Sequence, residues 1–232
     1  MKSNREVLLE MLEVVADALG EDLRLEVAFV GGCTTMLLIT DAYTLEFIRG
    51  TDDVDLVVEL EGTPQWYALE QRLKTLGFRN TGEDDVTCRF RLGAMKVDFM
   101  PTVEAVLGFA NPWFAGGLAS AITHRLPSGT LIKVFPSPWF LAAKLCAYAG
   151  RGRGDPAMSS DIEDVMALID GRPEMGEELL AAPPHLREFV ANAMDALYRL
   201  PAFEWVISST AQGEERLELL HQRIQSIIAC RS

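Results

Sequence analysis

Two carboxylates, separated by a single residue, stand at the start of an apolar segment of this 232-residue chain. They are Asp53 and Asp55, within the stretch 49–58 that reads RGTDDVDLVV. In an extended strand successive side chains point to opposite faces, so both acids project to one side and Asp52 to the other. Neighbouring carboxylates repel each other unless a cation neutralises them, and a hard ion such as Mg²⁺ prefers oxygen ligands. The spacing predicts a metal-binding pair at the mouth of a strand; the simpler interpretation is two solvated acids.

A glycine pair precedes this segment. The apolar run Leu25 to Val30 predicts a short buried strand that ends at Gly31-Gly32, and residues 33–39 then read as a helix. Glycine lets the backbone turn sharply and approach a ligand closely, and the free amides of a helix start favour an anion such as phosphate. By itself this pattern is more often a tight connection than a binding site.

A third acid falls on a later strand. Residues 86–92 and 95–100 flank Gly93-Ala94 and predict a hairpin, which follows an expected helix over 64–76. In its second arm Lys96 and Asp98 face one way, and the opposite face is apolar. Taken alone, such an acid is more often a solvated strand residue than a metal ligand.

The order of the predicted elements indicates an α+β fold with a mixed sheet, flanking helices and a helical C-terminal domain. Strand and turn patterns dominate up to two prolines, Pro136 and Pro138, and the chain is then almost wholly helical. We therefore expect a first domain over residues 1–135 and a second over 136–232, which closes the active-site cleft. The segment 41–50 is expected to be a loop inserted in the first domain.

Composition excludes several classes of protein. The net charge of −13 argues against sequence-independent binding along nucleic acids, which usually requires a basic surface. Apolar runs end well before the ~20 residues of a membrane span, so a cytoplasmic protein without membrane contact is expected. The four cysteines and three histidines lack zinc-site or disulfide spacing, and neither a Gly-x-Ser-x-Gly nor a Walker-type motif occurs.

Taken together, the glycine pair, the Asp-x-Asp pair and the third acid resemble the nucleotidyltransferases of the DNA polymerase β superfamily. The matching residues are Gly31-Gly32, Asp53-Val54-Asp55 and Lys96-Val97-Asp98. More narrowly, the chain looks like the AbiEii-type nucleotidyltransferases, toxins of abortive-infection and toxin-antitoxin systems. That likeness rests on the following residues: Arg49, Thr51, Lys144, Arg151, Arg153 and the run 160–164. The resemblance covers about residues 25–170.

The resemblance implies a Mg²⁺-dependent transfer of a nucleoside monophosphate from an NTP to an acceptor hydroxyl. Asp53, Asp55 and Asp98 would hold two Mg²⁺ ions, with Mn²⁺ as an alternative. The residues implied to contact the nucleotide are Gly31, Gly32, Thr34, Arg49, Thr51, Lys144, Arg151 and Arg153. Asp161 and Asp164, three apart on a helix, share a face and are expected to pair with those cations as supports.

Two features depart from the superfamily pattern. Cys33 follows the glycines where Ser or Thr is usual, so a hydroxyl contact to phosphate would have to come from Thr34. The spacing from Gly32 to Asp53 is also longer than usual, which requires the inserted loop. The acceptor stays open: RNA, such as a tRNA 3′ end, follows from the toxin resemblance, whereas the acidic charge fits a protein or small molecule as well. A catalytically silent nucleotide-binding protein, one half of a toxin-antitoxin pair, is the competing interpretation.

Overall fold

A computed structural model describes residues 2–81, 87–151 and 154–231 of the chain. The chain divides into two compact units. The first comprises residues 1–37 and 49–136, and the second comprises 38–48 and 137–232. The expected boundary near residue 136 coincides with the end of the first unit, but residues 38–48 group with the helical unit instead of forming an insertion in the first domain.

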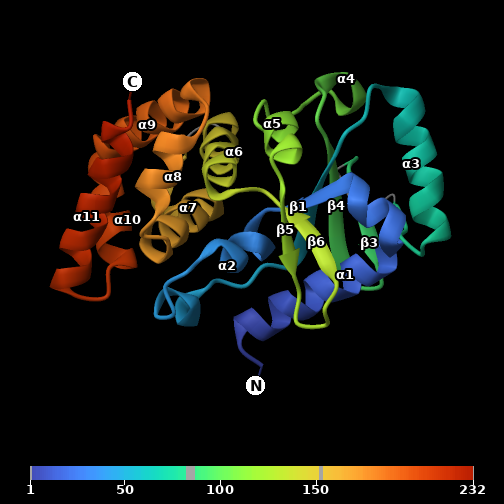
Figure 1. Cartoon of the computed structure of the whole chain (residues 1–232), viewed down its shortest axis with the longest axis horizontal. Helices are drawn as coiled ribbons and strands as arrows, with labels where there is room; N and C mark the ends of the chain where they lie inside the picture. The colour runs from blue at the N-terminus through green and yellow to red at the C-terminus, as the bar shows by residue number, and fades with distance from the viewer. Residues whose placement is uncertain (1, 82–86, 152–153, 232) are drawn as a thin grey trace. The chain divides into compact units, whose positions relative to one another are not determined.

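The first unit is built on a six-stranded mixed sheet with the order β3-β4-β2-β1-β6-β5 (Figure 1). The strands are β1 (Val27–Val30), β2 (Asp53–Val58), β3 (Arg89–Leu92), β4 (Met95–Pro101), β5 (Ile122–Arg125) and β6 (Leu131–Val134). Together with the helices of both units, this sheet confirms the predicted α+β fold.

Apolar alternation explains the central strands. In β2 the residues Val54 and Leu56 are fully buried, whereas Asp53 and Asp55, which alternate with them, are half-buried. In β4 the residues Val97 and Phe99 are buried beside them. Strand β2 pairs antiparallel with β1 and parallel with β4, so the acid-bearing strand lies between the other two strands expected to form the site.

Helices cover the sheet of the first unit. Helix α1 (Asn4–Glu26) contacts β1, β2 and β6 and buries a stripe of leucines that includes Leu8, Leu12 and Leu23 (Figure 1). Its start is fixed by a capping box between Ser3 and Glu6. The unit also contains α3 (Thr63–Thr75), α4 (Glu104–Leu107) and α5 (Phe114–Ala119).

Gly20 interrupts helix α1. Its φ of 69° and ψ of 173° break the helical geometry, and a second helical stretch follows at once and continues to Glu26. Strand β1 therefore begins at Val27 and not at Leu25. A helix resumes after Gly20 because Leu23 is fully buried, so packing of the following turn compensates for the local kink.

The turn after β1 is tighter than predicted. A 3₁₀ turn, η1 (Gly32–Thr34), leads into the single-turn helix α2 (Thr35–Leu38), where a longer helix over 33–39 was expected. The predicted hairpin across Gly93-Ala94 is confirmed by the pairing of β3 with β4, but its first strand begins at Arg89. Residue 86, where that strand was expected to begin, lies outside the described residues. Strands β5 and β6 form a second antiparallel pair.

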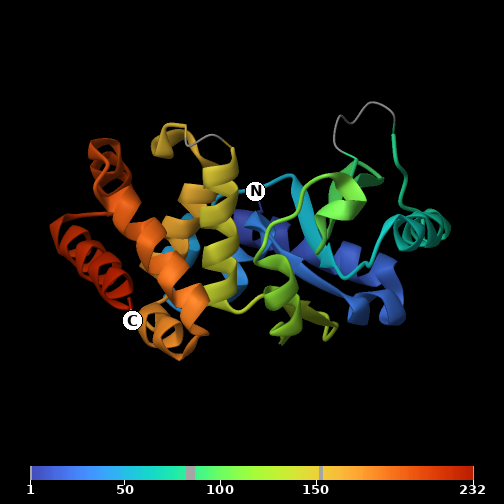
Figure 2. The ribbon, with the colours of Figure 1, turned by 90° about the horizontal axis from the view of Figure 1, so that it is seen from above.

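The second unit is helical. Its helices are α6 (Ser137–Gly150), α7 (Ser160–Gly171), α8 (Met175–Ala181), α9 (Pro184–Tyr198), α10 (Pro201–Thr210) and α11 (Glu214–Ala229), with a 3₁₀ turn, η3 (Pro156–Met158), before α7. Figure 2 shows α6 and α9 side by side, and α6 also packs on α7. Helix α10 begins with Pro201 in its first turn, where the missing N–H is tolerated. No helix among the described residues is long and apolar enough to cross a membrane.

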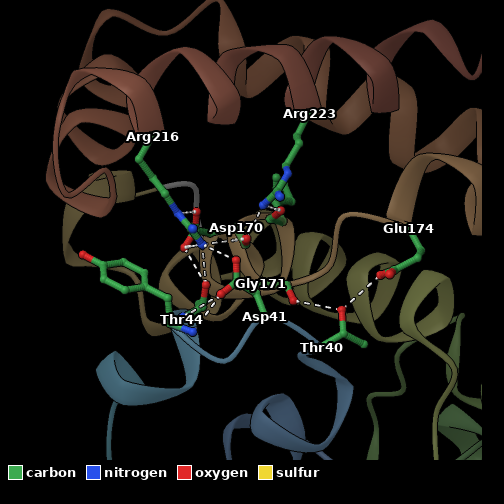
Figure 3. Close-up of polar contacts among 10 residues, drawn as sticks. Thr40, Asp41, Thr44, Asp170, Gly171, Glu174, Arg216 and Arg223 are labelled. Atoms are coloured by element: carbon green, nitrogen blue, oxygen red, sulfur yellow. Dashed lines mark hydrogen bonds and ion pairs between the residues drawn. The ribbon is translucent and has the colours of Figure 1, made fainter.

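Buried polar contacts hold the segment 38–48 in the second unit (Figure 3). The amides of Thr40 and Asp41 donate to the Gly171 carbonyl at 2.9 and 3.0 Å. Arg216 of α11 donates to both carboxylate oxygens of Asp170, at 2.7 and 2.9 Å, and to Asp41 at 3.0 Å. The segment includes a 3₁₀ turn, η2 (Thr44–Phe47), and is thus a structured part of the helical unit and not a free loop.

Candidate metal centre

Three aspartates converge in the first unit. Asp53 and Asp55 lie on β2 and Asp98 on β4, and one carboxylate oxygen of each lies within 4.8 Å of the others. The convergence follows from strand register, because Asp55 stands directly opposite Asp98 in the parallel β2–β4 pair. Paired residues on neighbouring strands point to the same face of a sheet, so the third acid joins the Asp-x-Asp pair.

Gly31 lies against this cluster. Val30 is the register partner of Asp55 in the antiparallel β1–β2 pair, and Gly31 follows it with a φ of 76°. A Cβ atom at this position would lie 1.9 Å from Asp55 Oδ2. The glycine is thus required both for its left-handed backbone and for the space that the Asp55 carboxylate occupies.

The residues after Gly31 serve the turn itself. Thr34 is buried, and its hydroxyl donates to the Gly31 carbonyl at 2.9 Å. The Cys33 thiol points back to the Val30 carbonyl, with 3.3 Å between sulfur and oxygen. Thr34 was expected to contact phosphate, but in this structure its hydroxyl stabilises the glycine turn.

The polar approach to β2 supports its first acid. The Thr51 hydroxyl donates to Asp53 Oδ1, which orients that carboxylate. Arg49 is half-buried and donates to the Gly50 carbonyl at 3.3 Å. Asp52 is exposed, precedes β2 and pairs with Lys96, whose hydrogen bond lowers the pKa of the Asp52 carboxyl. It does not belong to the group of three acids.

Arg89 is a site residue that sequence reasoning missed. Its guanidinium donates to both oxygens of Asp98, at 2.8 and 2.7 Å, and lies 3.9 Å from Asp53. A bidentate pair of this kind is among the stronger polar contacts of a protein, and here it partly neutralises three repelling carboxylates. The hairpin carried the signal: counting back from Gly93-Ala94 places Arg89 opposite Asp98.

The negative charge of the cluster reaches a neighbouring thiol. Burial raises the pKa of Cys88 to about 12, with further contributions from the charges of Asp98 and Asp55. The thiol is therefore protonated at neutral pH and offers no thiolate to a metal ion bound at the three acids.

The donor set fits a hard divalent cation. Ligand oxygens on one octahedral Mg²⁺ ion lie about 3–4 Å apart, close to the separations within the cluster. Three carboxylates are the oxygen ligands such an ion prefers, and among the described residues no histidine or cysteine joins them in a metal-ligating group. Arg89 engages both oxygens of Asp98, so an ion that bound this carboxylate would share it with the guanidinium.

The remaining predicted residues belong to the second unit and form a cluster of their own. Lys144 Nζ lies 2.6 Å from Asp164 and 3.4 Å from Asp161, and Arg151 also pairs with Asp161. Both aspartates are buried and share one face of α7, as their spacing predicted. Lys144 is thus an ion-pair partner in the helical unit, not a solvated lysine. Arg153 lies outside the described residues.

Comparison with known proteins does not assign a family. No family model matches the chain, and no curated protein matches it. Among solved structures, the crystal structure of JHP933 from Helicobacter pylori is similar at 12% sequence identity and a TM-score of 0.49, over 99% of this chain and 94% of that one. This likeness is too distant to carry an argument about activity.

Proposed function

We propose that this chain is a divalent-metal-dependent nucleotidyltransferase of the DNA polymerase β superfamily, related to the AbiEii type. The observation that carries the proposal is that three motifs, separate in the sequence, lie next to one another in the fold. Asp53 and Asp55, the facing Asp98 and the Gly31 turn lie together on adjacent strands. Each motif alone has a simpler explanation, but their convergence creates a compact oxygen-rich site with backbone beside it.

In the proposed reaction an acceptor hydroxyl attacks the α-phosphorus of an NTP. A bond forms between the acceptor oxygen and phosphorus, the bond from phosphorus to the pyrophosphate oxygen breaks, and the acceptor loses a proton. Bound Mg²⁺ or Mn²⁺ would supply Lewis-acid stabilisation of the attacking and leaving oxygens.

The residues of the first unit have distinct roles in this proposal. Asp53 and Asp55 hold the metal and Asp98 completes the set, with Thr51 orienting Asp53. Gly31 brings the backbone next to the carboxylates, where a side chain would exclude a phosphate. Arg89 balances the negative charge of Asp98 while no ion is bound.

Contacts to the triphosphate complete the proposal. In the first unit, Gly32 and Arg49 retain the roles that the resemblance implies, whereas Thr34 is buried and its hydroxyl donates to the Gly31 carbonyl. The same resemblance implies phosphate contacts for Lys144, Arg151 and Arg153. Asp161 and Asp164 would hold the lysine and Arg151 in defined positions. RNA is the proposed acceptor, and a protein or small-molecule acceptor remains the alternative for a chain of net charge −13. Regulation by a cognate antitoxin and a cytoplasmic location follow from the same resemblance.

A transfer assay tests the proposal. The chain is incubated with Mg²⁺ and each α-labelled NTP, with total RNA, protein extract or aminoglycosides as acceptors. Asp53→Asn and Asp55→Asn should each reduce labelling by about 100-fold or more. Asp52→Asn is the matched control, because it removes a neighbouring carboxylate that stands outside the cluster. Full activity in both cluster variants would refute the assignment.

One observation favours a second candidate, a nucleotide-binding protein without turnover. Arg89 donates hydrogen bonds to both oxygens of Asp98, so one of the three acids already has a cationic partner when no ion is bound. Calorimetry with Mg²⁺ and a non-hydrolysable NTP separates the two candidates. Metal-dependent binding without transfer to any acceptor supports the silent protein, whereas transfer refutes it.

A further inference from the structure

A row of side chains leads from the metal centre to the β3 end of the sheet. In the strand register Lys96 of β4 stands between Asp53 of β2 and Arg91 of β3. Arg91 in turn stands opposite Arg79, which is joined to β3 by an isolated antiparallel bridge. Directly opposed residues of neighbouring strands point to the same face of a sheet, so these side chains share the face that carries the three aspartates. Three cations thus follow Asp53 in order, and we call Lys96, Arg91 and Arg79 the cationic row.

The backbone holds the two arginines of the row side by side. The amide of Arg79 donates to the Arg91 carbonyl at 2.8 Å, and the amide of Arg91 donates to the Arg79 carbonyl at 2.7 Å. Like charges directly opposite each other destabilise a pair of strands, and an anion between them removes that cost. Arg79 is exposed and Arg91 is half-buried. Arg91 also has another partner within the chain, but a guanidinium has five N–H donors and can bind a ligand as well.

Both arginines line a pocket of the first unit. Its volume is about 630 Å³, and Thr81, Gly77 and Gly93 complete its lining among the described residues. A Cβ atom at either glycine would have no neighbour within 4 Å, so the backbone there borders open space. The charged members of this lining are the two guanidinium groups. The planar fork of N–H donors on arginine matches the oxygens of a phosphate group, so the lining favours an anion of that kind.

Lys96 lies between this pocket and the metal centre. Its ammonium pairs with Asp52, whose side chain is 75% exposed. An ion pair at such an exposed position contributes about 1 kcal/mol or less, so it does not fix the lysine strongly. An ammonium group has three N–H donors, and a phosphate can accept from those that Asp52 does not use. Lys96 therefore continues the row of phosphate-binding groups toward the aspartates.

The length of the row indicates the kind of anion that fits it. Neighbouring strands lie about 4.8 Å apart, so three spacings place the backbone of Arg79 about 14 Å from that of Asp53. A single phosphate or a triphosphate is shorter than this distance. A nucleic-acid strand carries a phosphate on every nucleotide and can contact cations along the whole row. The spacing of the cations therefore favours an extended strand over a mononucleotide.

We propose that the cationic row binds successive phosphates of a single nucleic-acid strand. Arg79 and Arg91 bind one phosphate in their pocket, and Lys96 binds a phosphate nearer the three aspartates. A chain of net charge −13 can bind a polyanion in this way because the contact is short and the cations are gathered on one part of one sheet face. Delivery of the strand's terminal hydroxyl to the metal centre rests on the proposed transferase function, whereas binding of the strand does not.

Fluorescence anisotropy with a labelled single-stranded RNA of about 12 nucleotides tests strand binding on the full chain. Mg²⁺ and NTP are omitted, so the result does not depend on transfer. Between about 50 and 200 mM salt, the logarithm of the binding constant should fall with the logarithm of the salt concentration with a slope of about −2, as three phosphate contacts require. Tripolyphosphate is the second probe and should bind more weakly than the RNA. Absence of RNA binding, or tighter binding of tripolyphosphate, would overturn the assignment to a strand.

Variants locate the binding. Arg79→Gln and Arg91→Gln should each weaken RNA binding about three- to tenfold and reduce the salt slope by about 0.7. Arg5→Gln is the control, because it removes the same charge from an exposed position on α1. Circular dichroism verifies folding, and Arg79→Gln is expected to fold because Arg79 is exposed.

The two proposals fail in different ways. RNA affinities of Arg79→Gln and Arg91→Gln equal to that of Arg5→Gln would contradict the role of the cationic row, even if the chain transfers nucleotides. Weaker RNA binding in both row variants would support that role, even if no transfer were detected.

Discussion

A Cβ atom at Gly31 would lie 1.9 Å from the Oδ2 atom of Asp55. The two residues are 24 positions apart in sequence, from 31 to 55, yet the antiparallel pairing of β1 with β2 brings the glycine turn onto the carboxylate. The space that the Asp55 carboxylate occupies thus depends on Gly31 having no side chain.

Gly31→Ala should therefore be far more damaging than an ordinary glycine substitution. The φ of 76° alone costs alanine about 1–2 kcal/mol, and the overlap with Asp55 adds about 1–3 kcal/mol. Gly93→Ala is the matched control, because Gly93 has a φ of 61° and a Cβ there would have no neighbour within 4 Å. Urea unfolding measures both. Equal losses of stability in the two variants would show that the Asp55 contact is not constraining.

Arg89→Gln should destabilise the protein in EDTA and strengthen its binding of Mg²⁺. Without the guanidinium, three carboxylates repel each other and Asp98 loses two hydrogen bonds, a loss of about 1–3 kcal/mol in the free energy of unfolding. Mg²⁺ should restore much of that loss by replacing the missing positive charge. Thermal unfolding with and without the ion, and calorimetric titration, measure the two effects.

Arg5→Gln, which replaces an exposed arginine of α1, is the control for this variant and should change neither quantity appreciably. Weaker Mg²⁺ binding by Arg89→Gln would mean that the arginine helps to hold the ion instead of competing with it.

Asp170→Asn should destabilise the helical unit strongly. Asp170 is only 4% exposed and accepts from Arg216 and Thr44, so the change removes one of the two carboxylates that the half-buried Arg216 guanidinium contacts and leaves Asp41 as the other. Losing these charge-assisted hydrogen bonds in a buried position costs about 2–4 kcal/mol. Arg199→Met breaks an ion pair whose arginine is 74% exposed and should cost about 1 kcal/mol or less. Denaturant midpoints compare the two, and a small effect at Asp170 would contradict the role assigned to the network in Figure 3.

Acid should weaken the attachment of the segment 38–48 through Asp41. Burial acts to raise the pKa of Asp41, but hydrogen bonds from the Tyr43 amide, from Arg216 and from the Thr44 amide outweigh burial and lower it. A carboxyl whose pKa is lower in the folded state stabilises the fold above its unfolded-state pKa, and this contribution is lost as the pH falls through the folded-state value.

The free energy of unfolding of the natural chain should consequently fall more steeply between about pH 5 and pH 2 than that of Asp41→Asn. Arg216→Met, which removes one of the groups that lower this pKa, should flatten part of the same slope. Identical slopes for the natural chain and Asp41→Asn would exclude Asp41 as a source of acid sensitivity.

Local patterns predicted most of the elements near the site. Alternation predicted β2 and the β3–β4 hairpin, and the glycine pair marked the end of β1. The less accurate predictions share one cause. Strand β1 begins at Val27 instead of Leu25, and residues 38–48 joined the second unit, because burial of Leu23 and the Asp170–Arg216 network are contacts that local propensity does not contain.

The sequence by itself determined that Asp53 and Asp55 share a face, because the two-residue period of a strand is a property of the backbone. It also placed Arg89 opposite Asp98, since a short hairpin defines its own register. Only the tertiary structure decided that Asp98 faces Asp55 and that Gly31 touches it. Those contacts depend on β2 pairing with β4 on one side and β1 on the other, and pairing between distant strands is chosen by packing of the whole sheet.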